Sequence, residues 1–469
     1  MNDLAPLSIA VVGHTNVGKT SLLRTLTRQR HFGEVADRPG VTRHAERIDL
    51  LLQGEVAARF FDTPGLEDSI ALLEELRALP VPGRSHPSPA DRVRAFLQSP
   101  LASARFEQEA KVLRTLLEQA DAALLVIDAR APALPKYRAE MELLASCARP
   151  VMPVLNFVSA PGSRRIEWHA ALREAGLHAL AEFDAVAPFT GAEQALYRDL
   201  ATLLPARRAQ LDVIASGLLM EAAARDRQTR MEMASALISA AALRRRISAA
   251  QYADSAQRQA CEAALQADCA RIAHEAARRL LERHAFAPED ALPAHLPLLE
   301  QRWQDDLFHP AFLQETGRRL GLGTALGMSM GAIADTALAG LSLGTATTLG
   351  GVIGSAFSGG WQPLISKAGS RLQGKRELTV DDAVLLILAA QLLALNQALI
   401  ARGHAASQPL AAQSLPTPAL PEPQARALAR ALRPARIHPE WEAAPDMGNY
   451  DFDRHRLQEK VANLLLKND

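Results

Sequence analysis

The chain has 469 residues, a formal net charge of zero and 22% charged residues. The balanced charge gives no general argument for binding nucleic acid or an acidic partner. A mean hydropathy of −0.04 is typical of a soluble globular protein rather than a polytopic membrane protein. The cysteines Cys147, Cys261 and Cys269 follow no zinc or disulfide spacing, and no signal peptide is recognisable at Met1 to Pro6. We therefore expect a cytoplasmic protein of about three domains.

The first motif in the chain is Gly13-His14-Thr15-Asn16-Val17-Gly18-Lys19-Thr20. An apolar run over 9–12 precedes it and a helical pattern opens at Ser21, which is the strand–GxxxxGK(S/T)–helix context of a P-loop. In this context the backbone N–H groups face a phosphate. Lys19 would reach the β- and γ-phosphates, and the Thr20 hydroxyl would bind Mg²⁺. The sequence therefore predicts nucleotide binding by residues 13–21.

Two motifs of the same kind follow. In the stretch 37–43, Thr42 is placed to close over Mg²⁺ and the γ-phosphate as a switch I residue. Strands are predicted over 48–52 and 56–61, and the second runs directly into Asp62-Thr63-Pro64-Gly65. Asp62 would hold Mg²⁺ through water, and the Gly65 N–H would contact the γ-phosphate.

These motifs resemble the TrmE–Era–EngA group of bacterial small GTPases over residues 1–205. The resemblance implies an α/β fold: a P-loop NTPase G domain with a mostly parallel sheet flanked by helices, which hydrolyses GTP. In that group the asparagine at the position of Asn16 can ligate a potassium ion that replaces an arginine finger. Leu66 stands where Ras-type enzymes have a catalytic glutamine. Hydrolysis would therefore draw on the cation, a backbone group or a residue from elsewhere, and we expect Lys19, Thr42, Gly65 and Asn16 to be the catalytic residues.

The base-recognition motif departs from the pattern of the group. After predicted strands over 122–127 and 151–155, the chain has Asn156-Phe157-Val158-Ser159 in place of N-K-x-D. In the group the aspartate accepts two hydrogen bonds from guanine and the lysine stem covers the base. Ser159 cannot accept both bonds, so guanine preference over adenine is weakened or comes from other residues. Asn156 and Phe157 remain expected nucleotide contacts. The last motif of the group, S-A-x, has its best match at 187–190.

An insertion of about 67–119 interrupts the predicted G domain and begins at switch II, the segment that opens with Asp62-Thr63-Pro64-Gly65. Helices are predicted around 72–79 and 106–119, on either side of a turn-rich piece over 80–89. The insertion either reports the nucleotide state or decorates the surface, and the sequence leaves both interpretations open. A helix around 194–203 completes the domain.

The C-terminal part is predicted to be mainly α-helical. Long helices are expected over 211–249 and 256–284, within a region 206–300, and Arg244 to Arg246 are interpreted as a solvated helix face. A further apolar helix over 383–400, with a capping start at Thr379, belongs to an apolar domain 301–404. A proline- and alanine-rich linker, 405–423, and a helical tail, 424–469, follow.

Glycines recur at four-residue spacing in the stretch 320–365, whose one formal charge is Asp335. Small residues on one face let two helices pack closely, so a helical hairpin is expected here. The hairpin lies either inside the soluble domain or in a membrane, where Asp335 would be costly at the midplane. Both interpretations remain open.

Together these features predict a nucleotide-dependent switch that hydrolyses GTP to GDP and phosphate with Mg²⁺ and K⁺. It would transmit its nucleotide state to the helical domain, which would act on an unidentified protein partner. The alternative is a weakly hydrolysing nucleotide-binding scaffold, held at the inner face of the membrane by residues 320–365. Nucleic acid is not an expected partner, because no KH-like G-x-x-G occurs in a basic context.

Overall fold

The computed structural model describes residues 5–29, 32, 46–84, 86–286, 375–406, 420–443 and 451–466. Thr42, the glycine-rich stretch 320–365 and residues 407–419 of the predicted linker lie outside this set. The chain divides into two compact units, 1–223 with 401–407 and 224–400 with 408–469. The first unit therefore includes the start of the predicted long-helix region and a short segment after residue 400.

A six-stranded sheet forms the centre of the first unit, with the strand order β2-β3-β1-β4-β5-β6. All neighbours are parallel except β2 and β3, which form an antiparallel hairpin. The strands β1, β4 and β5 are almost fully buried, as expected for parallel strands covered on both faces. The predicted α/β fold is confirmed. The strand bounds are β1 Leu7–Val12, β2 Glu46–Leu52, β3 Glu55–Asp62, β4 Ala122–Asp128, β5 Val151–Asn156 and β6 Ala181–Glu182.

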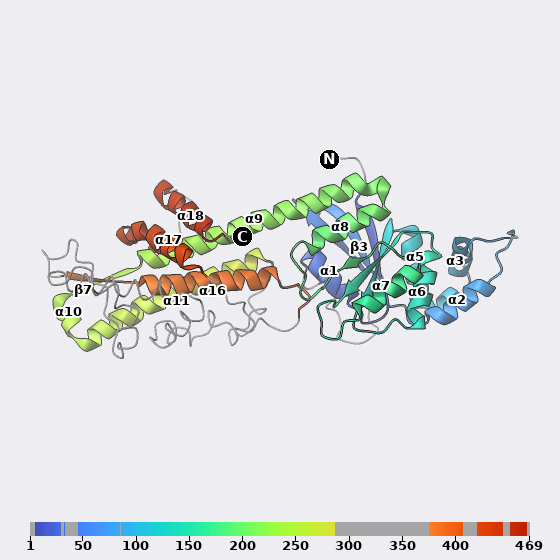
Figure 1. The fold of residues 1–469 in the computed structure, drawn as a ribbon, viewed down its shortest axis with the longest axis horizontal. Helices are drawn as coiled ribbons and strands as arrows, with labels where there is room; N and C mark the ends of the chain where they lie inside the picture. The colour runs from blue at the N-terminus through green and yellow to red at the C-terminus, as the bar shows by residue number, and fades with distance from the viewer. Residues whose placement is uncertain are drawn as a thin grey trace. The chain divides into compact units, whose positions relative to one another are not determined.

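Helices cover both faces of this sheet (Figure 1). Because side chains alternate along β1, Ile9 and Val11 point into one core and Ala10 and Val12 into the other. The first core is shared with α1 (Lys19–Thr27), α8 (Ala192–Leu203) and the first turns of α9 (Arg208–Ala242). The second is shared with α2 (Ser69–Ala78), α3 (Pro89–Leu97), α4 (Leu101–Ala104), α5 (Glu107–Glu118), α6 (Pro135–Ala145) and α7 (Arg165–Glu174). A short 3-10 helix, η1 (Pro205–Arg207), joins α8 to α9.

The insertion at switch II is built into this second core. Its helices α2 to α5 include α3, which begins within the stretch that the sequence predicted as turns only. Ser88 and Asp91 form a capping box there, and Pro89 occupies the first turn. Phe96 and Phe106 are buried, with their ring centroids 6.2 Å apart. The insertion is therefore part of the hydrophobic core of the unit rather than a surface addition.

The described residues of the second unit form helices and one two-stranded sheet. Helix α16 (Asp382–Ile400) is apolar on all sides and packs on α11 (Ser255–Arg283) and α17 (Glu422–Leu432) within one large core. The buried Arg454 fixes the last helix, because its guanidinium donates to the Trp441 carbonyl at 3.0 Å and to the Ser239 hydroxyl at 2.9 Å. Beyond α9, the elements are β7 Arg244–Ser248, α10 Ala249–Ala253, α11 Ser255–Arg283, β8 Lys375–Thr379, α16 Asp382–Ile400, α17 Glu422–Leu432, η4 Arg433–Ile437, η5 Pro439–Glu442 and α18 Phe452–Leu464.

Two details of the predicted helical part are wrong. The first long helix ends at Ala242 rather than 249, because β7 pairs with β8 in an antiparallel ladder. Its arginines are therefore in a strand, where Arg246 Nε lies 2.9 Å from Glu377 and Arg245 pairs with Asp268. Thr379 ends β8 and does not cap α16, which begins three residues later at Asp382.

None of the helices in the described ranges is long and apolar enough to cross a membrane. The stretch 320–365, to which the membrane interpretation applied, is not part of those ranges.

Candidate functional site

The P-loop connects β1 to α1, and its backbone requires glycine at two positions. Gly13 has a φ of +141°, and an added Cβ would lie 2.4 Å from the Val126 carbonyl oxygen. Gly18 has a φ of +93°, and a Cβ there would lie 2.4 Å from Asn156 Nδ2. A side chain at either position would both strain the backbone and clash. The loop is therefore held close against the ends of β4 and β5.

Lys19, the first residue of α1, folds back over the loop. Its Nζ donates to the carbonyl oxygens of Gly13 at 3.1 Å and His14 at 2.9 Å. The side chain is 8% exposed, and burial lowers the pKa of the ammonium group from its ordinary value. Because carbonyl oxygens compensate a buried cation only partly, this ammonium is placed to bind an anion.

Two predicted magnesium ligands, Thr20 on α1 and Asp62 at the end of β3, are in contact. The Thr20 hydroxyl donates to Asp62 Oδ2 at 2.6 Å. The other carboxylate oxygen, Oδ1, is buried and has no hydrogen-bond partner among the described residues. Burial raises the pKa of Asp62 to about 6, which a nearby divalent cation would oppose. An orphaned carboxylate oxygen beside a hydroxyl fits Mg²⁺, which prefers hard oxygen ligands and keeps waters.

Switch II leaves the sheet directly beside the P-loop. A Cβ on Gly65 would lie 2.2 Å from Thr15 Oγ1, so only glycine allows this approach. The next residue, Leu66, donates its N–H to the Gly13 carbonyl at 3.2 Å, and its side chain is fully buried in the core. Leu66 therefore cannot position a water molecule at the phosphate site.

A buried polar cluster supports the P-loop from α6. His14 Nδ1 lies 2.7 Å from the Leu66 carbonyl and 2.9 Å from Glu140 Oε1, while Nε2 lies 3.0 Å from Lys136 Nζ. A carbonyl only accepts and an ammonium only donates, so Nδ1 carries the proton and the imidazole is neutral. Burial, and then Lys136, lowers the pKa of His14, in agreement with this tautomer. Burial also raises the pKa of Glu140 to about 8.

A second buried carboxylate, Glu109 on α5, holds switch II from the insertion. Its Oε1 accepts the N–H groups of Glu67 at 3.1 Å and Asp68 at 3.0 Å. In turn, the exposed carboxylate of Glu67 accepts the Thr15 hydroxyl at 3.0 Å. The insertion is thus linked to the P-loop through one hydrogen-bonded chain. Sequence analysis missed both Glu109 and Glu140, because neither lies in a motif and each acts across more than 40 positions of the chain.

Asn156 joins the three segments that surround the predicted base site. Its Nδ2 donates to the Val17 carbonyl at 3.0 Å, and its Oδ1 accepts the N–H groups of Phe157 and Ala185, both at 3.0 Å. The loop that follows β6 therefore reaches the site at Ala185. This contact is made two residues before the stretch 187–190 proposed for S-A-x.

The ring of Phe157 lies beside the P-loop. The Phe157 backbone has a φ of +60°, and the Cζ atom of the ring would lie 3.5 Å from a Cβ added to Gly18. The Arg130 guanidinium lies 4.0 Å from the centre of the ring. Asp128 at the end of β4 holds this guanidinium through Oδ1 and Oδ2, at 2.9 and 2.7 Å. A cation thus covers the ring, although the sequence motif has lost its own lysine.

The remaining predicted site residues lie in the same loop. Val17 is buried beneath it and Ser21 lies in the first turn of α1. Asn16, with a φ of +64°, is exposed on the loop. Among the described residues, no group of three or more His, Cys, Asp or Glu side chains forms another metal site.

Two family models match the chain in succession. Residues 8–157 match the family described as "50S ribosome-binding GTPase", and residues 169–464 match "Domain of unknown function (DUF3482)". The probable GTP-binding protein EngB of Anaeromyxobacter sp. is 32% identical over 192 residues, which are 39% of this chain and 74% of EngB. GTPase Der of Azorhizobium caulinodans is 33% identical over 149 residues, 32% of this chain. The chain spans only 26% of the length of Der.

Among solved structures, a crystal structure of Era in complex with MgGDPNP and a segment of 16S ribosomal RNA is similar with a TM-score of 0.27 and 20% identity. The similarity covers 39% of this chain and 52% of that chain. The resemblance expected from the motifs is confirmed by the sequence matches. The chain therefore belongs to the DUF3482 family and carries, N-terminal to that helical region, a P-loop G domain of the bacterial small GTPases.

Proposed function

We propose that the protein hydrolyses GTP to GDP and phosphate and transmits its nucleotide state to the helical domain. The observation that carries this proposal is the triad of Lys19, Thr20 and Asp62, with its buried ammonium and its orphaned carboxylate oxygen. The direct test is phosphate release from GTP and from ATP by the purified full chain in Mg²⁺. Release from neither nucleotide would contradict the proposal and favour a binding scaffold.

The chain's own groups suggest how the reaction proceeds. Lys19 exchanges its two carbonyl partners for the β- and γ-phosphate oxygens and stabilises the charge that develops on them. Mg²⁺, held by Thr20 and Thr42 and through water by Asp62, would neutralise the same phosphates. The Gly65 N–H is beside the P-loop, where it can donate to the γ-phosphate. A water molecule attacks in line, without help from the buried Leu66.

Because the described residues offer no glutamine beside Gly65, we propose that Asn16 ligates a potassium ion between the phosphates. We expect GTP turnover to be several-fold faster in KCl than in NaCl at equal ionic strength. Sodium would draw its ligands too close to engage all of them. The measurement is steady-state phosphate release in the two salts.

The matched variants for this prediction are Asn16→Ala and Asn16→Gly. Both remove the amide oxygen, and glycine also retains the left-handed backbone that Asn16 adopts. We expect both variants to lose the difference between the salts while still binding GTP. Equal wild-type rates in KCl and NaCl would exclude the cation and require a catalytic group from elsewhere.

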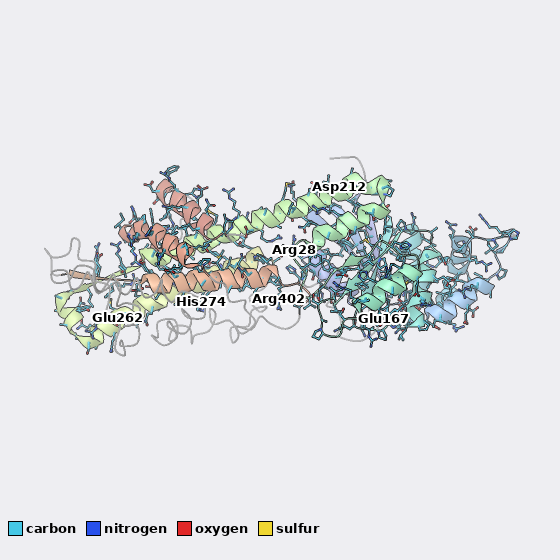
Figure 2. The ribbon with its side chains drawn as sticks, in the orientation of Figure 1. Arg28, Glu167, Asp212, Glu262, His274 and Arg402 are labelled. Atoms are coloured by element: carbon cyan, nitrogen blue, oxygen red, sulfur yellow. The ribbon has the colours of Figure 1, made fainter. Side chains whose placement is uncertain are left out.

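A short segment offers a route from the base site to the helical domain. Residues 401–406 follow directly on α16 in the chain and pack in the first unit, where Figure 2 labels Arg402. The Gly403 N–H donates to the Val186 carbonyl at 2.8 Å, and a Cβ on Gly403 would lie 1.9 Å from the Ala185 carbonyl oxygen. The loop that contacts Asn156 therefore also holds the end of the segment leading from α16.

We expect Gly403→Ala to disconnect this route. The new methyl group would overlap the Ala185 carbonyl and push the segment off the loop. In the wild type, hydrogen exchange of peptides at the C-terminal end of α16 should differ between the GTP-analogue and GDP states, and the variant should lose this difference. Gly217→Ala is the control, since its methyl group meets only the movable Leu52 side chain, at 3.1 Å. An undiminished difference in Gly403→Ala would remove this segment from the proposal.

A further inference from the structure

The base site lacks the aspartate of N-K-x-D, but a different carboxylate, that of Asp184, lies on the loop after β6. Ser159, at the position of the N-K-x-D aspartate, is exposed. Asp184 directly precedes Ala185, whose N–H is bonded to Asn156, and is only 6% exposed. Asp184, the second residue after β6, thus brings a carboxylate to the segment that Asn156 ties to the P-loop.

The carboxylate of Asp184 is fixed through one oxygen. Oδ1 accepts the N–H groups of Val186 at 3.0 Å and Ala187 at 3.2 Å. Within the described ranges, Oδ2 makes no hydrogen bond. The loop therefore holds the side chain in one orientation and leaves one acceptor oxygen available. An ionised carboxylate oxygen has two lone pairs and can accept two N–H groups.

The other acid near the site is already engaged. Both oxygens of Asp128 accept from Arg130, whose guanidinium covers Phe157. Asp184 is close enough to contribute, after Asp128, to the raised pKa of Arg130. The carboxylate of Asp184 therefore interacts electrostatically with this guanidinium, and one of its oxygens is still unused.

We propose that Asp184 is the residue that selects guanine, accepting the N1–H and the exocyclic amine through Oδ2. Guanine presents two donors at this edge, whereas adenine presents a ring nitrogen acceptor that a carboxylate oxygen repels. This inference rests on the proposed GTP-binding function, because it assigns the base contact of that same site. The position of the acid has moved from the loop after β5 to the loop after β6.

The test exchanges one oxygen of Asp184 for a donor. Asp184→Asn retains Oδ1 for the two backbone N–H groups and places an NH₂ group at the base edge. Xanthine has a carbonyl where guanine has the amine. We therefore expect GTP affinity to fall by about tenfold or more and XTP affinity to rise. Competition of GTP, XTP and ATP against a fluorescent GTP analogue on the full chain gives the ratios. A role in the loop alone would lower all affinities alike and leave the GTP/XTP ratio unchanged.

Two further variants make the result decisive. Glu182→Gln makes the same carboxylate-to-amide change on β6, where the side chain pairs with His169, and should leave the ratio unchanged. The double variant Ser159→Asp/Asp184→Ser moves the carboxylate back to the loop after β5, and its preference for GTP should persist. A wild-type preference for GTP that survives in Asp184→Asn would overturn the inference alone. A wild type that binds no GTP would overturn the proposed function, and the inference with it.

Discussion

Replacing Lys19 by alanine is expected to abolish binding of GTP while both units remain folded. The ammonium is the one basic group that the P-loop holds at the phosphate position, 3.1 and 2.9 Å from two loop carbonyls. A charge-assisted hydrogen bond to phosphate contributes about 1.5–3 kcal/mol, and two of them are lost. The affinity should therefore fall by about a hundredfold or more. Equilibrium titration with a fluorescent GTP analogue measures this change.

The control for Lys19→Ala is Lys111→Ala, on α5, where the side chain pairs with Glu107 at 2.7 Å. This variant should bind GTP as the wild type does. Circular dichroism and thermal unfolding of both variants should resemble those of the wild type, since Lys19 donates two hydrogen bonds within the described part of the chain, both to carbonyls of its own loop. An affinity of Lys19→Ala for GTP within about tenfold of the wild-type value would remove the P-loop from the proposed function.

The parts of the fold that follow from local patterns were predictable. The apolar runs of β4 and β5 are buried on both faces, and the glycines of the P-loop occupy positions that other residues cannot. Lys19, Thr20 and Asp62 could be proposed as site residues from the sequence because each has a fixed place in a short motif. Thr20 and Asp62 meet at 2.6 Å because β1, which leads through the P-loop into α1, is the neighbour of β3 in the sheet.

The supporting residues were not predictable, because their partners are distant in the sequence. Glu140 lies in an ordinary helical pattern, and only the packing of α6 brings it to His14. In our proposal, Arg130 and Asp184, on other loops, take over the roles of the N-K-x-D lysine and aspartate. A motif search therefore shows only that the lysine and the aspartate are missing. The strand β7 begins with three arginines, a composition that resembles an exposed helix until β8 supplies Glu377.

Glu140 has a direct consequence for stability. Its side chain is 2% exposed and has one hydrogen-bonded partner, His14, among the described residues. Burial raises its pKa from 4.5 to about 8, although Lys136 and Lys19 lower it in part. The folded state therefore holds a proton that the unfolded state has released. The contribution of Glu140 to stability is complete below pH 4.5 and is lost as the pH rises to about 8.

Glu140→Gln is expected to remove this loss, because an amide is neutral at every pH and its oxygen can still accept from His14. The variant should be more stable than the wild type, by about 1 kcal/mol near pH 5.5 and about 4 kcal/mol near pH 8. Urea unfolding at the two pH values measures the difference, and hydrogen exchange of peptides over 122–156 assigns it to the first unit. Glu142→Gln, on the same helix but 52% exposed, is the control and should show no such dependence. A difference between Glu140→Gln and the wild type that is constant with pH would mean that Glu140 is ionised in the folded protein, with Lys136 and Lys19 outweighing its burial.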